Sequence, residues 1–82
     1  MSRYEIHEII KLYQLDENFV RVCIDNQWII PADVEGGVLD QEDLSRLLLI
    51  NDLRFSMDIN EEAIPVIMQL LDQIYWLKKQ LS

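Results

Sequence analysis

The sequence predicts a single, mostly α-helical domain with four helices and a small β-hairpin. Three observations support this prediction. Apolar residues recur at helical spacing in separate stretches, a segment with Pro and Gly interrupts them, and 82 residues suit one small domain. Half of the residues are hydrophobic, which is enough to form a core. The expected order is a helix-turn-helix over about 6–26, a hairpin over about 29–39, a third helix over about 41–55 and a long last helix over about 61–80.

One apolar stripe predicts each of the first two helices. The stripe of the first has the spacing i, i+3, i+4, i+7 and consists of Ile6, Ile9, Ile10 and Tyr13. The stripe of the second consists of Phe19, Val20, Cys23 and Ile24. Asp16 is a good N-cap for the second helix, and Glu17 suits its positive end. Two short helices joined by a tight turn form the helix-turn-helix pattern.

The segment "IIPADVEGGVL", residues 29–39, predicts a hairpin wing after the helix-turn-helix. A wing that contacts DNA normally carries Arg or Lys, because phosphate contacts need cations. This segment and the start of the next helix carry five carboxylates instead, on Asp33, Glu35, Asp40, Glu42 and Asp43. We expect this acidic surface to face solvent and to bind a partner.

Two further helices are predicted after the wing. Asp40 is placed to cap the third helix, with Asp43 at the third position in a capping-box role. The leucines and isoleucines of that helix are numerous enough to bury more than one face. Asn60 is expected to cap the last helix, with Glu61 in its first turn and Pro65 early enough to be tolerated.

The last helix also carries a short heptad pattern. Its two sets of apolar residues at seven-residue spacing are Ile67, Ile74 and Leu81, and Leu70 and Leu77. Two heptads are too few to establish a coiled coil. Tyr75 and Trp76 lie beside this pattern and are candidates for a dimer or second interface, since both residue types are common at binding hot spots. For Trp76, burial by another helix of the same domain is the alternative to an interface. Trp28 is expected to fill the core.

Composition excludes several classes of function. The net charge is −8, and residues 31–60 carry seven acidic and two basic groups, so no nucleic-acid binding is expected. A single His7 and a single Cys23 predict no metal site and no internal disulfide. No stretch is apolar enough to cross a membrane, and no cofactor or enzymatic activity is expected. Cysteine use fits a reducing, cytoplasmic compartment.

Two family resemblances follow from these segments. "YEIHEIIKLYQLDENFVRVCIDNQWIIP" followed by "GGVLDQEDLSRLLLINDL" resembles the winged-helix layout of MerR-type regulators. The resemblance departs where such regulators contact DNA, because Val38 and Leu39 replace the usual Arg and Tyr and the second helix offers only Arg21. "LINDLRFSMDINEEAIPVIMQLLDQIYWLKKQL" is similar to the C-terminal half of the CbpM family of chaperone-modulatory proteins, with Ala63 at a frequent Gly position.

The CbpM resemblance implies a function and a partner. Members of that family bind the J-domain of CbpA, a DnaJ-like co-chaperone, and restrain its action with the chaperone DnaK. A J-domain presents a basic helix beside its His-Pro-Asp loop, so an acidic winged helix is suited to cover it. The alternative is a degenerate MerR-type transcription regulator that acts as a dimer. A homodimer through the last helix is compatible with either function.

Overall fold

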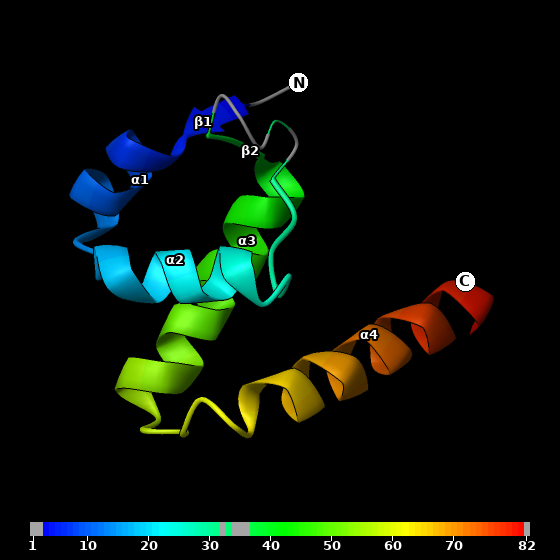
Figure 1. Ribbon diagram of the computed structural model, residues 1–82. Helices are drawn as coiled ribbons and strands as arrows, with labels where there is room; N and C mark the ends of the chain where they lie inside the picture. The colour runs from blue at the N-terminus through cyan, green and yellow to red at the C-terminus, as the bar shows by residue number, and fades with distance from the viewer. Residues whose placement is uncertain (1–2, 32, 34–36, 82) are drawn as a thin grey trace.

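The structure, a computed structural model, describes residues 3–31, 33 and 37–81. Within these ranges it is mostly α-helical with a small antiparallel sheet, which confirms the predicted fold class (Figure 1). The elements in chain order are β1 (Arg3–Glu5), α1 (Ile6–Tyr13), α2 (Glu17–Asp25), β2 (Val38–Asp40), α3 (Gln41–Asn51), the π-helical turn η1 (Asp52–Ser56) and α4 (Ile64–Leu81).

Local hydrogen bonds form the turn between α1 and α2. Gln14 has a left-handed backbone with φ of 54°, which ends α1 and turns the chain. The Leu15 N–H then donates to the Ile10 carbonyl at 3.0 Å. The Asp16 carboxylate accepts from the Phe19 N–H at 3.0 Å, as the sequence predicts for the N-cap. The two helices of the predicted helix-turn-helix therefore begin and end close to the expected residues.

The small sheet joins the start of the chain to the segment before α3. β1 pairs with β2 in antiparallel register, with Tyr4 opposite Leu39. A further bridge between Asp33 and Val38, with hydrogen bonds of 3.3 and 3.1 Å, closes the predicted wing. Gly37 has a φ of 64°, a conformation that favours glycine. The apolar pattern of the sequence does not predict β1, which anchors the wing to the beginning of α1.

The third helix changes its hydrogen-bonding pattern near its end. It is α-helical to Asn51 and π-helical from Asp52 to Ser56, and the Met57 N–H donates to the Asp52 carbonyl at 3.1 Å. Asp58 then takes a left-handed backbone with φ of 55°. The expected helix over about 41–55 is present, but its last turn holds one residue more than an α-turn.

The last helix starts later than the sequence predicts. Asn60 does cap the chain, because its side-chain oxygen accepts from the Ala63 N–H at 3.0 Å, but the residues up to Ala63 form a turn. Pro65 explains the shift. It has no N–H to donate to the Glu61 carbonyl four residues earlier, so the α-helical ladder begins only at Ile64.

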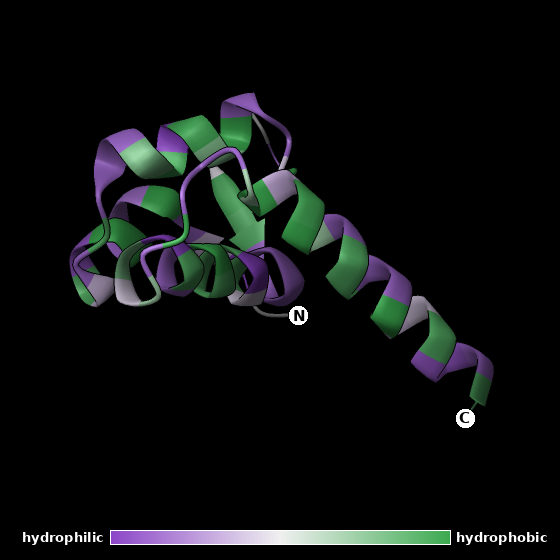
Figure 2. Cartoon of the chain, turned by 90° about the horizontal axis from the view of Figure 1, so that it is seen from below, coloured by the Kyte–Doolittle hydropathy of each residue, from purple (hydrophilic) through white to green (hydrophobic). Residues whose placement is uncertain are grey.

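The core lies between α1, α2, α3, β2 and the first turns of α4. Its buried hydrophobic residues are Ile9, Leu15, Phe19, Val20, Cys23, Ile29, Leu39, Leu44, Leu47, Ile50, Leu53, Ile64 and Met68. Beyond these first turns α4 projects away from the other elements (Figures 1 and 2). The radius of gyration is 13.1 Å, whereas a compact domain of this length has about 12 Å. The projecting helix accounts for the difference.

Candidate functional site

The exposed face of α2 is charged, and its charges do not favour DNA. Glu17, Arg21 and Asp25 recur at four-residue spacing and are all exposed, so they line one face of the helix. This face has two carboxylates and one guanidinium. In a helix-turn-helix that reads DNA, the second helix enters the major groove and needs cations for the phosphates. The local charge of α2 is therefore unsuited to contact with a polyanion.

The structure brings three of the five predicted acidic site residues together at the start of α3. Asp40 and Asp43 form the predicted capping box: the Asp43 N–H donates to Asp40 Oδ1 at 2.8 Å, and the Asp40 N–H donates to Asp43 Oδ2 at 3.4 Å. Glu42 lies between them and is exposed. Asp33 is exposed before β2, and Glu35 lies outside the described residues.

The two capping carboxylates are held close together, and this affects their ionisation. Partial burial raises the pKa of the Asp43 carboxyl above its ordinary value, and the nearby Asp40 and Glu42 carboxylates raise it further. The Asp40 N–H works in the opposite direction. Both aspartates therefore have a structural role in addition to any contact with a partner, so Glu42 is the cleaner probe of binding.

A groove of about 500 Å³ runs between α3 and α4, beside this acidic helix start. On the α3 side it is lined by Glu42, Asp43, Ser45, Arg46 and Leu49. On the α4 side it is lined by Met68, Leu71, Asp72, Ile74, Tyr75 and Lys78. Carboxylates at one rim and apolar side chains from both helices thus share one depression. The sequence predicts the acidic residues and Tyr75 on separate surfaces, whereas the structure brings Glu42 and Asp43 into the same groove as Tyr75.

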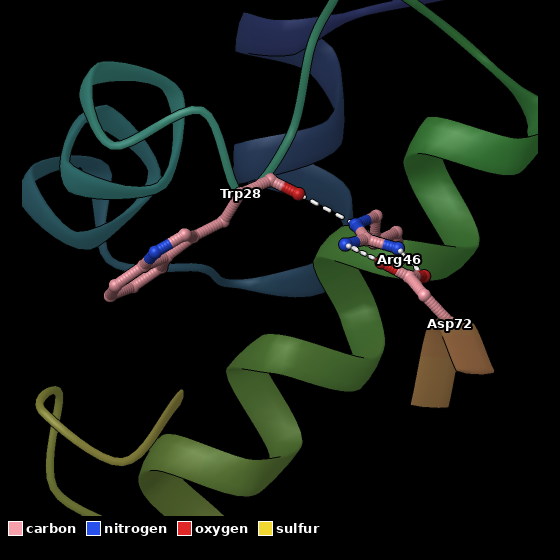
Figure 3. Close-up of polar contacts among 3 residues, drawn as sticks. All are labelled: Trp28, Arg46 and Asp72. Carbon is pink, nitrogen blue, oxygen red and sulfur yellow. Dashed lines mark hydrogen bonds and ion pairs between the residues drawn. The ribbon is translucent and has the colours of Figure 1, made fainter. Parts of the chain in front are cut away.

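Arg46 connects the two walls of this groove. Its guanidinium donates two hydrogen bonds to the Asp72 carboxylate, at 2.8 and 3.2 Å, and its Nε–H donates to the Trp28 carbonyl at 2.6 Å (Figure 3). Bidentate pairs of this kind have defined geometry as well as charge. The hydrogen bonds from Arg46 lower the pKa of the Asp72 carboxyl. This cluster, called the Arg46 clasp below, fixes α4 against α3 and the segment after α2.

Tyr75 and Trp76 are both exposed but lie on different faces of α4. Tyr75 follows Met68 by seven residues and Leu71 by four, so the three share the face toward α3, and all three line the groove. Trp76 is about 100° further round the helix and does not line it. The Lys79 ammonium lies 5.3 Å from the centre of the Tyr75 ring. The two aromatic residues therefore do not form one continuous patch.

A further apolar stripe on α4 is left exposed by the rest of the described chain. Leu70, Ile74, Leu77 and Leu81 are 52, 51, 54 and 88 % exposed. Their spacing of four, three and four residues places them on one side of the helix, and Ile74 also lines the groove beside α3. This stripe is called the outer stripe below. Contiguous exposed apolar surface commonly marks a site of protein–protein contact.

His7 and Cys23 lie in different surroundings. His7 is exposed on α1, and Cys23 is completely buried in the core. Burial raises the pKa of the Cys23 thiol to about 12. Residues 3–31, 33 and 37–81 contain no cluster of three or more His, Cys, Asp or Glu that could hold a metal ion. Over the same ranges no helix is long and apolar enough to cross a membrane.

Comparison with known proteins agrees with the arrangement of the helices. The family described as "MerR HTH family regulatory protein" matches residues 4–82. The chain belongs to this family. Comparisons with curated proteins and with solved structures give no match.

Membership in the MerR HTH family makes the chain one of a family of regulatory proteins with a helix-turn-helix, and the order of α1 and α2 agrees with that motif. In this member the charge of α2 contrasts with the apolar and acidic surface around α4. Sequence reasoning missed the Arg46 clasp, because Arg46 and Asp72 are 26 residues apart and neither belongs to a motif. It also missed Leu49 and Leu71 as groove residues, since apolar residues at helical spacing predict core.

Proposed function

We propose that this chain is a non-enzymatic chaperone modulator that binds the J-domain of a DnaJ-like co-chaperone of the CbpA type and restrains its action with DnaK. The observation that carries the proposal is the pairing of an acidic rim, at Glu42 and Asp43, with an apolar groove between α3 and α4. A J-domain offers a basic helix, which complements this rim. The excess of carboxylates over cations on the exposed face of α2 also favours a protein partner over DNA.

Charge and apolar contact have different roles in such a complex. Acidic residues at the rim orient a basic partner and speed its approach, whereas buried apolar contacts slow its dissociation. The formal net charge of −8 strengthens the long-range attraction to a basic surface. The proposed modulator would cover the surface of the J-domain that DnaK recognises, and the two proteins would then compete for it.

Titration of a J-domain of the CbpA type tests the proposal. We expect Glu42→Lys to slow association several-fold at low salt and to weaken its salt dependence, because rim charges act mainly on the association rate. Asp25→Lys is the matched control, since it makes the same charge change on an exposed residue of α2. The variant Glu35→Lys extends the test to the wing. Absence of J-domain binding by the wild-type chain, or equal effects of Glu42→Lys and Asp25→Lys, would contradict the proposal.

The outer stripe favours a second candidate, a MerR-type transcription regulator that acts as a dimer. Leu70, Ile74, Leu77 and Leu81 could pair with the same stripe of a second copy. In an antiparallel pair, the acidic residues before α4 would approach the basic residues Lys78 and Lys79 of the other copy. A dimer that retains an operator duplex would support this candidate, and a chain that retains only a J-domain would contradict it.

A further inference from the structure

We infer that the groove between α3 and α4 binds one amphipathic α-helix of a partner protein, which places apolar side chains on the groove floor and a basic side chain against Glu42. The inference deepens the proposed function and rests on it for the identity of the partner. The chemistry of the occupant, by contrast, is argued from the groove alone.

The groove floor is apolar and incompletely covered. Leu49 of α3 is 41 % exposed and Tyr75 of α4 is 57 % exposed, and Leu71 between them is partly buried. Met68 closes the depth of the groove and belongs to the core. An occupant that removed these side chains from water would gain hydrophobic stabilisation without displacing any part of the described chain.

The charges around the floor are unequal. Arg46 and Asp72 neutralise each other through the Arg46 clasp, so neither needs a partner from outside. This leaves Glu42 and Asp43 on the α3 rim against Lys78 on the α4 wall. No cation within the described part of the chain forms an ion pair with Glu42 or Asp43. The α3 rim therefore favours a cationic side chain on the occupant.

The walls of the groove determine which backbone conformation fits. Both are helices, whose backbone groups are hydrogen-bonded within the helix, so they offer no strand edge to an extended peptide. An extended segment on the apolar floor would leave its own N–H and C=O groups without partners, at a cost in free energy. An α-helix satisfies these groups internally and can present a continuous apolar stripe.

A pair of labelled peptides tests this inference on the full chain. The first is an 18-residue amphipathic helix of Leu and Lys, about 27 Å long, and the second is a scramble of the same composition without an apolar stripe. We expect the first to bind more tightly, as measured by fluorescence anisotropy at two salt concentrations. Equal binding of both peptides would show simple charge attraction and would overturn the inference.

Two neighbouring residues of α4 provide matched variants. Tyr75→Ala removes a groove side chain, whereas Trp76→Ala removes a side chain of similar exposure, 60 %, from another face. We expect Tyr75→Ala to weaken binding of the amphipathic peptide about tenfold, and Trp76→Ala to change it less than about twofold. Thermal melts check that both variants fold. Equal losses of peptide affinity in the two variants would overturn the inference. The inference would also be overturned if Tyr75→Ala weakened self-association of the chain while the wild-type chain did not bind the peptide.

Titration of the J-domain with the same two variants separates this inference from the proposed function. A J-domain that binds wild type and Tyr75→Ala equally well would overturn the groove as its site and leave the proposed function in place. A peptide that depends on Tyr75, together with no J-domain binding, would support the groove and contradict the proposed function. Dependence of both ligands on Tyr75 and not on Trp76 would support both.

Discussion

The nine residues of α2 bury three apolar side chains, whereas the eighteen residues of α4 bury only two. The exposed faces differ as well. α2 presents charged residues to solvent, and α4 presents the outer stripe and part of the groove. Figure 2 shows apolar residues along the whole projecting length of α4. The difference teaches that, in this member of the MerR HTH family, the last helix exposes more apolar surface than the second helix of the helix-turn-helix.

The largest expected effect is on stability and separates buried from exposed apolar residues. Phe19 on α2 is 4 % exposed and packs edge-to-face on Phe55, with 5.1 Å between the ring centroids. We expect Phe19→Ala to lower the free energy of unfolding by about 3–5 kcal/mol, because it leaves a cavity. Leu77→Ala on α4 should change it by less than about 0.5 kcal/mol. Urea unfolding curves measure both, and Phe19→Leu provides a milder variant if the alanine variant does not fold.

The next effect concerns self-association through the outer stripe. We expect the wild-type chain to form a dimer at tens of micromolar concentration, and Leu77→Lys to weaken this dimer at least about tenfold by placing a charge in the contact. Gln69→Lys is the control, because it adds the same charge on another face of α4. Sedimentation equilibrium distinguishes the states. A wild-type chain that sediments as a single species near 9.8 kDa would contradict the prediction.

A smaller effect should come from the attachment of α4 to α3. Arg46 lowers the pKa of Asp72 in the folded chain, so the unfolded chain binds more protons as the pH falls. The pair makes its full contribution to the free energy of unfolding above pH 3.8, the ordinary pKa of an aspartate carboxyl. This contribution is lost as the pH falls through the lowered pKa of Asp72. We expect Asp72→Asn to destabilise by less than about 1 kcal/mol at neutral pH, since Asp72 is largely exposed.

Urea unfolding at neutral and acidic pH measures this contribution. The difference between wild type and Asp72→Asn should disappear at the acidic end, where both side chains are neutral. Asp25→Asn removes a different exposed carboxylate and serves as the control. A difference that persists unchanged at low pH would show that the charge of Asp72 has no part in holding α4.

The smallest expected effect is the binding of duplex DNA by the exposed face of α2. Non-specific binding by DNA readers has dissociation constants of roughly 10⁻⁴ to 10⁻⁶ M, and we expect this chain to bind more weakly than that range at physiological salt. The double variant Glu17→Lys, Asp25→Lys would give the exposed face of α2 three cations and should gain weak, salt-sensitive binding. A micromolar gel shift with the wild-type chain would contradict the prediction.

The parts of the fold that could be predicted from sequence depend on local interactions. The caps at Asp16 and Asp40 involve residues within one helical turn, and the structure confirms both. Of the predicted α1 stripe, Ile9 is buried, Ile6 and Ile10 are partly buried, and Tyr13 is exposed. Contacts between distant residues could not be predicted. β1 needs β2 as its partner about 35 residues later, and three residues with one apolar side chain carry no clear strand signal.

The candidate site was predictable only in part for the same reason. Its acidic members could be found because an accumulation of carboxylates is visible in the sequence. The groove depends on how far α4 diverges from α3, which the helical pattern does not determine. Ile67 and Ile74 belong to the same predicted heptad set, yet Ile67 packs against the core, whereas Ile74 is 51 % exposed. A pattern of apolar residues shows that a helix has an apolar face, but it does not show which part of the protein or which partner covers that face.

The completely buried Cys23 allows the opening rate of the core to be measured by alkylation of its thiol. The thiolate is the form that attacks alkylating reagents, and burial, which raises the pKa of the Cys23 thiol to about 12, makes this form scarce at neutral pH in the folded chain. Alkylation must therefore wait until the core opens, and the labelling rate reports how often it does so. Because the sequence contains one cysteine, a single mass increment would time these openings, with or without a ligand bound to α4.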